Sequence, residues 1–180
     1  STRRTSSGSC VSSVRWGRLS GHPNIVNILE VGSTPEGFPF IVMQYHPHAS
    51  LDLRIRRDGP LDWRDVLRLG IKVAGALETA HRAGTLHRDI KPANVLLTAE
   101  GVPKLADFNI SFAGTVLGTN PVSYFGGSLA YMSPEQLAAC HPDDPAEPSD
   151  LDTRSDIYAL GCVMYEAVTG VPPRSERAHV

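Results

Sequence analysis

The most informative stretch of this 180-residue sequence is HRDIKPAN, residues 87–94, which is followed by Asp107-Phe108-Asn109. These two strings combine the polar groups that phosphoryl transfer from a nucleotide needs. The reaction requires a carboxylate to orient the acceptor hydroxyl, a cation to neutralise the moving phosphate, and two oxygen ligands to hold Mg²⁺ against the phosphates. The sequence provides all four groups within 19 residues, in Asp89, Lys91, Asn94 and Asp107.

Short apolar runs lie between these polar residues. Residues 95–97 and 104–106 predict two short strands, and loops between strands are a common place for a functional site. We expect the first of these strands to turn the chain back, so that Asp107 meets Asn94.

Two longer segments predict helices. Residues 62–83 carry apolar side chains at helical spacing, with Asp62 as the N-cap, Asp65 as its capping-box partner and Gly84 as the stop. Residues 152–169 are apolar on almost every side, so we expect this helix to be buried on most sides.

The first part of the chain predicts less regular structure. Residues 1–18 contain four arginines and no acidic residue, and predict a basic, disordered segment. Residues 25–32 and 38–45 predict two strands that are joined by a short turn at residues 34–37.

Composition excludes several classes of function. The formal net charge is −2, which gives no electrostatic reason to expect nucleic acid binding. The three cysteines lie far apart and predict reduced thiols in a reducing compartment, so we expect a cytoplasmic location. No run of 18 apolar residues occurs, so we expect no membrane segment in this chain.

The strings at residues 87–94 and 107–109 resemble the H-R-D-x-K-x-x-N and D-F-G motifs of the eukaryotic-type protein kinases. The lysine two positions after the aspartate resembles the lysine found there in the serine/threonine branch of the family. The motif sequences are most similar to those of bacterial members. The resemblance covers about residues 19–173 and includes further motifs in the same order, at residues 22–26, 40–46, 133–135 and 156–161.

This resemblance implies a two-lobed α+β protein-kinase-like fold with a partial N-lobe sheet and a mainly helical C-lobe. Residues 1–18 would be the basic Ser- and Arg-rich segment outside the family. Residues 19–46 would be a remnant of the N-lobe with the hinge. Residues 47–180 would be a partial C-lobe with the catalytic loop, the activation segment and a central buried helix.

The resemblance also implies roles for individual residues. Asp89 is implied as the catalytic base or hydroxyl-orienting group, and Lys91 as a contact of the γ-phosphate. Asn94 and Asp107 are implied as ligands of Mg²⁺ in the nucleotide site. Arg88 is implied as a partner of a phosphorylated activation-segment residue, for which the candidates are Thr115, Thr119 and Ser123.

The adenine side of the site is implied in the same way. Met43 would be the gatekeeper, the backbones of Gln44 and His46 would bind adenine, and Leu96 would lie under the ring. Ser128 stands where the family has a residue that touches the catalytic aspartate. The resemblance thus implies ATP and Mg²⁺ as cofactors, and protein substrates with Ser or Thr acceptors.

The sequence departs from the family at several places. The Gly-rich loop, the strand lysine and its glutamate partner should all precede His22, yet the first lysine is Lys72 and the first acid is Glu30. The family's C-lobe also continues beyond Gly170. We therefore expect a fragment that is cut at both ends, prone to aggregation and inactive alone. Asn109 in place of the motif's glycine is a mild change, since asparagine tolerates left-handed backbone.

The sequence is also compatible with two other functions. A pseudokinase or regulatory binding module fits the lack of the Gly-rich loop and the strand lysine. An aminoglycoside-type phosphotransferase would share the lobes and metal ligands, but its string usually reads H-G-D without the lysine that Lys91 represents here.

Overall fold

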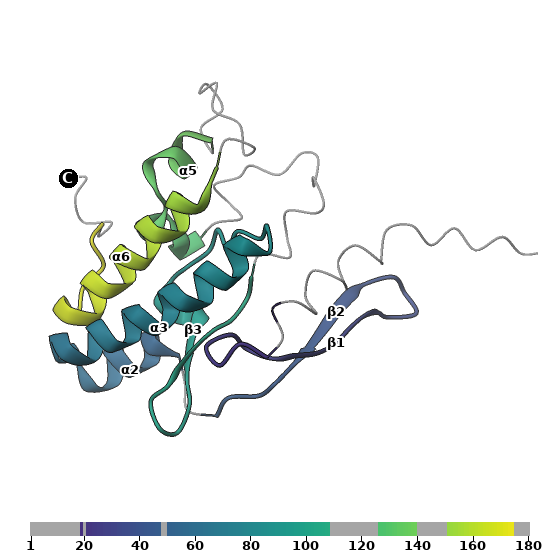
Figure 1. Cartoon of the computed structure of the whole chain (residues 1–180), viewed down its shortest axis with the longest axis horizontal. Coiled ribbons are helices and arrows are strands. Elements are labelled where there is room, and N and C mark those ends of the chain that lie inside the picture. The colour runs from purple at the N-terminus through teal and green to yellow at the C-terminus, as the bar shows by residue number, and fades with distance from the viewer. Residues whose placement is uncertain (1–18, 20, 48–49, 109–125, 140–150, 175–180) are drawn as a thin grey trace, which may run out of the picture.

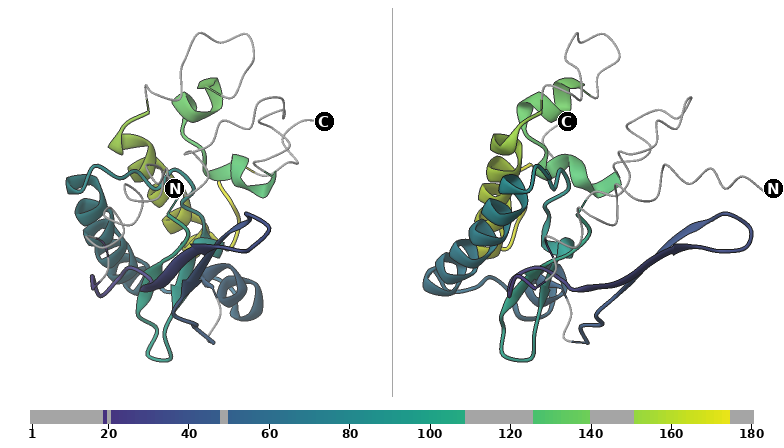
Figure 2. Two further views of the ribbon diagram at one scale, coloured as in Figure 1. Left: turned by 90° about the vertical axis from the view of Figure 1, so that its right-hand side faces the viewer. Right: turned by 45° about the vertical axis from the view of Figure 1, so that its right-hand side comes forward.

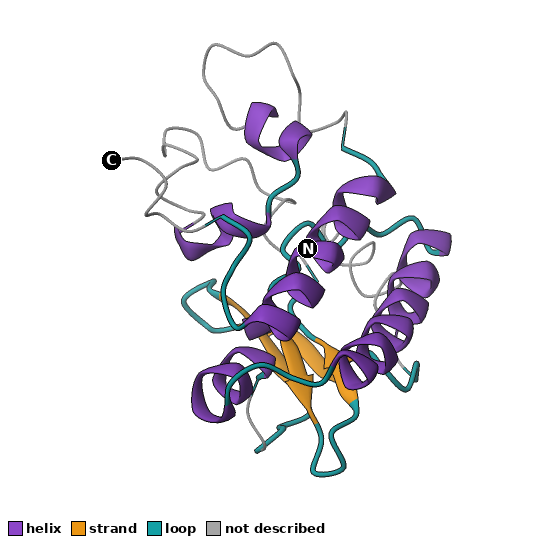
Figure 3. Ribbon diagram, turned by 90° about the vertical axis from the view of Figure 1, so that its left-hand side faces the viewer, coloured by secondary structure: helices purple, strands orange, loops and turns teal. Residues whose placement is uncertain are grey.

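Two long helices, α3 (Trp63–Arg82) and α6 (Thr153–Thr169), lie side by side and form most of the helical part of the molecule (Figures 1 and 3). The computed structural model describes residues 19, 21–47, 50–108, 126–139 and 151–174. The other described elements are the strands β1 (Ile28–Ser33), β2 (Pro39–Met43), β3 (Val95–Leu97) and β4 (Pro103–Leu105), and the helices α2 (Leu51–Asp58) and α5 (Pro134–Ala139). Single 3₁₀ turns occur at Pro92–Asn94 and Gly126–Tyr131.

Helix α3 begins and ends where the sequence predicts. The Asp62 carboxylate accepts from the Arg64 N–H at 2.8 Å, but Asp65 binds Arg68 instead of completing a capping box. At the other end Gly84 has a φ of +70°, and the Thr85 N–H donates to the Ala80 carbonyl at 2.9 Å. This pattern is a Schellman stop, and it releases the chain just before residue 87.

Helix α6 packs closely against α3 along one side. A Cβ built on Gly70 would lie 2.7 Å from the Met164 sulfur, so a larger residue at this position would require the flexible Met164 side chain to move. The prediction that α6 is buried on most sides is wrong within the described residues, because α3 and its neighbours cover one face only. The opposite face carries exposed apolar side chains at Ile157, Tyr165 and Val168.

The main core lies between α3, α6 and the short strands. It contains fully buried side chains from each of these elements and from α2, among them Leu51, Val73, Leu77, Val95, Leu105 and Val163. These core residues come from both sides of residues 87–94, which we call the catalytic string. The core therefore fixes the position of the loop that connects α3 to β3.

Strands β1 and β2 pair as an antiparallel ribbon that projects from the helical body (Figure 2). This confirms the predicted hairpin. The ribbon connects to the body through residues 24–26: the Val26 N–H donates to the Leu105 carbonyl at 2.9 Å, and the Leu105 N–H donates to the Asn24 carbonyl at 2.8 Å. The described residues therefore form a small β portion on a mainly helical body, as the α+β prediction required.

Helix α2 was not predicted. Ser50 caps it by accepting from the Leu53 N–H, and Gly59 follows its last turn. Only Leu51 and Ile55 are buried from this charged eight-residue helix, so the sequence shows little apolar periodicity.

Several predictions fall outside the described residues. These are the basic segment 1–18, the candidate phosphosites Thr115, Thr119 and Ser123, the change at Asn109, and the side chain of Ser128. Among the residues that the structure does describe, none of the helices is both long and apolar enough to cross a bilayer.

Candidate active site

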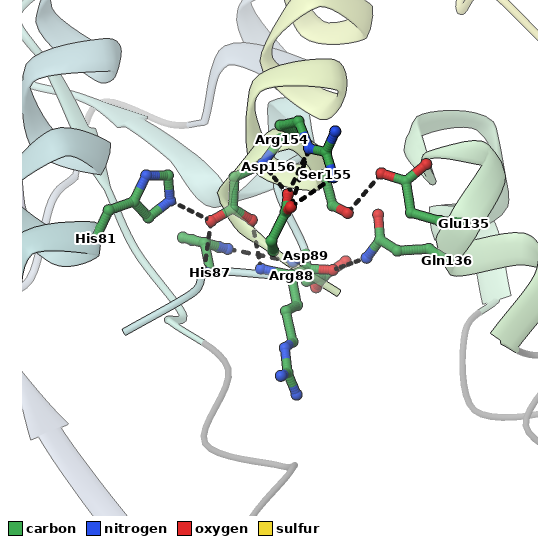
Figure 4. Close-up of polar contacts among 10 residues, drawn as sticks. His81, His87, Arg88, Asp89, Glu135, Gln136, Arg154, Ser155 and Asp156 are labelled. Atoms are coloured by element: carbon green, nitrogen blue, oxygen red, sulfur yellow. Dashed lines mark hydrogen bonds and ion pairs between the residues drawn. The ribbon is translucent and has the colours of Figure 1, made fainter. Parts of the chain in front are cut away.

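The catalytic string is anchored by one buried carboxylate of α6. Asp156 accepts from the His87 N–H at 2.9 Å through Oδ2, and from the Arg88 N–H at 2.7 Å through Oδ1 (Figure 4). His81, at the end of α3, contacts the same Oδ2 at 2.7 Å. Asp156 is only 1% exposed, so these bonds compensate the cost of burying its charge. Asp156 begins the family motif that the sequence places at residues 156–161, whereas His81 was not predicted.

Two residues of the site have left-handed backbone. Arg88 has a φ of +65° and Asp107 a φ of +55°. This conformation costs roughly 1–2 kcal/mol for a residue with a Cβ, so surrounding contacts must hold it. At Arg88 the bond to Asp156 is one such contact.

His87 connects the catalytic string to the segment before Asp107. Its Nε2 lies 2.8 Å from the Ala106 carbonyl, and its Nδ1 accepts from the Asp89 N–H at 3.3 Å. These partners assign the neutral tautomer with the proton on Nε2. Burial lowers the pKa of His87, which favours the same neutral form. The ring also packs on Phe108 at 4.6 Å between centroids.

Two of the predicted polar side chains contact the carboxylate of a third, Asp89. The Lys91 ammonium lies 2.8 Å from Asp89 Oδ2, and the Asn94 amide nitrogen donates to the same oxygen at 3.0 Å. The Asn94 nitrogen also donates to the Asp89 backbone carbonyl at 2.8 Å. Among the described residues, both side-chain contacts to the carboxylate go to Oδ2, which leaves Oδ1 as the oxygen that can accept from an incoming hydroxyl.

Asp107 is brought to Asn94 by the β3–β4 hairpin. Val95 pairs with Leu105, and the Ala106 N–H donates to the Asn94 carbonyl at 2.9 Å. The Asp107 side chain is exposed next to this bond. Since the Asn94 nitrogen is committed to Asp89, its side-chain oxygen remains for a cation beside the Asp107 carboxylate. Amide and carboxylate oxygens suit a hard divalent cation.

The residues of the predicted adenine side lie on β2, just after it, and on β3. Met43 and Asp107 line the same small apolar cavity, of about 20 Å³, together with Phe108. The Gln44 N–H donates to the Asn27 carbonyl at 2.9 Å, so any adenine contact at Gln44 would use its carbonyl. Leu96 lies on β3, opposite Lys104. Burial, followed by the nearby Lys104 charge, lowers the pKa of the half-buried His46 imidazole.

Helix α5 and the 3₁₀ turn before it attach to the body near the catalytic string. The Tyr131 hydroxyl donates to Glu166 of α6 at 2.5 Å, and the Ser155 hydroxyl donates to Glu135 at 2.8 Å. Two hydrogen bonds to the Glu135 carboxylate lower its pKa, the larger from the Glu135 backbone N–H and the other from the Ser155 hydroxyl. A second residue of α5, Gln136, reaches the catalytic string itself and was also not predicted.

Comparison with known proteins identifies the family of this chain. A protein kinase domain model matches residues 9–179. The serine/threonine-protein kinase PknK of Mycobacterium tuberculosis is 51% identical over 154 residues, which are 86% of this chain and 13% of PknK. A probable serine/threonine-protein kinase of Clostridium perfringens is 44% identical, covering 84% of this chain and 21% of that protein. The serine/threonine-protein kinase PknB of Mycolicibacterium smegmatis is 36% identical, covering 84% and 24%.

The chain therefore belongs to the protein kinase family. Within that family it is a bacterial-type serine/threonine kinase domain, in agreement with the resemblance of its motifs. The chain spans less than a quarter of the length of each of these relatives. The family uses ATP with a divalent metal and acts on serine and threonine hydroxyls of proteins.

Proposed function

We propose that the protein containing this chain transfers the γ-phosphoryl group of Mg·ATP to serine or threonine hydroxyls of protein substrates. The observation that carries this proposal is the convergence of Lys91 and Asn94 on one oxygen of the Asp89 carboxylate. The arrangement restrains the carboxylate and leaves its other oxygen for a substrate hydroxyl, which is the geometry that phosphoryl transfer needs.

Each predicted residue has a specific task in this proposal. Asp89 Oδ1 accepts the hydrogen bond of the acceptor hydroxyl and orients it towards the phosphorus. Lys91 balances the charge of Asp89 and would contact the γ-phosphate. Arg88 would bind a phosphorylated residue of the activation segment.

Asn94 and Asp107 would hold Mg²⁺ through their side-chain oxygens. When bound, the ion neutralises phosphate charge. Adenine would lie between Leu96 and the ribbon end, with the backbones of Gln44 and His46 as hydrogen-bonding partners and Met43 at the back.

The first test is Mg·ATP binding to this chain by calorimetry, with Asp107→Ala as the variant. We expect measurable binding that the substitution abolishes, because one of two metal ligands is removed. Asp58→Ala is a matched control, since that exposed carboxylate lies on α2 and pairs with the neighbouring arginines Arg54 and Arg57. Equal binding by the chain and by the Asp107 variant would contradict the proposed metal site.

The second test is phosphoryl transfer by the intact gene product. A generic protein acceptor should be labelled from ATP in the presence of Mg²⁺, and an aminoglycoside should not. Labelling of the aminoglycoside alone would favour the small-molecule reading, and binding of ATP without any transfer would favour the pseudokinase reading. We expect this chain assayed alone to show no measurable transfer. The family's strand lysine should precede His22, and the first lysine of this chain is Lys72.

A further inference from the structure

Helix α5 begins with a capping box at Ser133-Pro134-Glu135-Gln136. The Gln136 N–H donates to the Ser133 hydroxyl oxygen at 3.3 Å, and the Gln136 side-chain oxygen accepts from the Ser133 N–H at 3.1 Å. Proline follows the cap at the first helical position, where its missing N–H has no cost. A glutamate at position 136 would complete this box equally well. The cap therefore explains the side-chain oxygen of Gln136, but it does not explain the amide nitrogen.

The amide nitrogen of Gln136 binds the catalytic string. It donates to the Arg88 carbonyl at 2.9 Å, across 48 positions of sequence (Figure 4). Gln136 is 7% exposed, so little water competes for this bond. The carbonyl that it holds belongs to the peptide that joins Arg88 to Asp89.

The two peptides that meet at Arg88 are thus held from two different helices. Asp156 of α6 holds the N–H on one side of the Arg88 Cα, and Gln136 of α5 holds the carbonyl on the other. Fixing both peptide planes fixes the left-handed φ of Arg88. Within the described part of the chain, the N–H of this second peptide also donates to His87, over a longer 3.3 Å.

We propose that Gln136 is a positioning residue for Asp89, an inference that rests on the proposed function. Its amide sets the plane of the peptide that leads into Asp89, and so the direction of the Asp89 carboxylate. The same amide connects α5, at the end of the segment that follows Asp107, to the catalytic string. The alignment of Asp89 therefore depends on α5 being docked.

Three substitutions separate this role from that of the helix cap. Gln136→Glu keeps the capping oxygen but loses the N–H donor. Gln136→Met loses the donor without adding a charge. Ser133→Ala loses the Ser133 hydroxyl of the cap but leaves the Gln136 amide in place.

Hydrogen exchange measured on this chain is the first readout. Both Gln136 variants should speed exchange of the Asp89 amide by about tenfold, because the peptide that carries it is released. Ser133→Ala should leave that exchange within about twofold of the parent chain while lowering the melting temperature through its weaker cap.

Steady-state kinetics of the intact gene product are the second readout. Both Gln136 variants should lower kcat by about tenfold with the KM for ATP within about twofold, because positioning acts on the reaction and not on nucleotide affinity.

Unchanged Asp89 exchange in both Gln136 variants would overturn the proposal. It would also be overturned if Ser133→Ala had the same effects as the Gln136 variants, because the capping role would then suffice. Should the unsubstituted gene product fail to transfer phosphate, the proposed function fails, and the exchange data still decide whether Gln136 holds this peptide.

Discussion

The helical body and the β1–β2 ribbon contribute to the candidate site in different ways. In the body, the catalytic string is bonded to α6 through Asp156, to α5 through Gln136, and to the end of β4 through His87. The ribbon meets the body through a pair of backbone hydrogen bonds at residues 24–26, and its apolar side chains are largely exposed, with Phe38 at 69% and Leu29 at 62%.

The two halves of the site are therefore positioned by different contacts. The groups proposed to act on phosphate and metal are positioned within the body, by contacts that also stabilise the fold. The groups proposed to bind adenine depend on how the ribbon meets β4. Substitutions of the residues that anchor the catalytic string to the body should therefore change stability and catalysis together, whereas substitutions in the ribbon should leave stability almost unchanged.

The largest expected effect is at Asp89, where the comparison predicts loss of transfer without loss of the site. Asp89→Asn should lower kcat of the intact gene product by about 10³, since the hydroxyl loses its charged acceptor. Mg·ATP affinity should stay within about threefold because Asn94 and Asp107 remain. Activity assays and calorimetry on the same samples check this. A large loss of affinity would mean that Asp89 also holds the nucleotide site together.

A pair of core and ribbon substitutions tests the comparison through stability. Leu77→Ala, at a fully buried position of α3, should lower the free energy of unfolding by about 3 kcal/mol. Val42→Ala, on the exposed side of the ribbon, should change it by less than about 0.5 kcal/mol. Urea denaturation measures both. Similar losses for the two variants would show that the ribbon is part of the same cooperative unit.

Two glycines at and near the end of α3 should respond with opposite signs. Gly84→Ala should cost about 1 kcal/mol, because the residue has left-handed backbone although nothing lies near its Cβ position. Gly75→Ala should stabilise by about 0.5–1 kcal/mol, because this helical glycine also has open space around it. Thermal unfolding of both variants checks the prediction, and stabilisation by Gly84→Ala would contradict the Schellman stop.

The smallest effect concerns pH. Burial lowers the pKa of His87 below its usual value of 6.5. Between the lowered value and 6.5 the unfolded chain binds a proton that the folded chain does not, so His87 makes stability fall as pH falls below 6.5 and has no effect above it. Protonation would also turn Nδ1 from an acceptor into a donor facing the Asp89 N–H.

NMR titration of the imidazole tests this sign directly. His87 should remain neutral at pH values where a histidine of ordinary pKa is already protonated. The loss of stability between pH 7.5 and 5.5 should be smaller in His87→Leu than in the parent chain. Titration of His87 at or above 6.5 would contradict the prediction.

Much of the catalytic side could be predicted from sequence, because its residues lie close together along the chain. A short hairpin is enough to bring Asp107 back to Asn94. The joint spacing of the polar residues at 87–94 also indicates a functional site and not an ordinary surface loop. The two long helices were equally accessible, since Asp62, Gly84 and Gly170 mark their ends with local chemistry.

The remainder depends on tertiary docking, which the local sequence does not encode. His81 and Gln136 act on groups that are 75 and 48 positions away, and only their docking identifies their partners. A signal for Gln136 did exist in the S-x-x-Q pattern of a capping box, but it points to the cap alone. The apolar composition of α6 likewise indicates a large apolar surface, but it does not show which face of the helix packs against another element.

The anchoring of the catalytic string by Asp156 also has a consequence for the order of events during synthesis. His87 and Arg88 leave the ribosome 69 and 68 residues before the carboxylate that holds their N–H groups. At roughly 5–20 residues per second, this interval lasts several seconds. During that time α3 and the β3–β4 hairpin can form, but Arg88 has no reason to adopt its strained backbone. The shape that aims Asp89 is therefore acquired late, once α6 has emerged and docked.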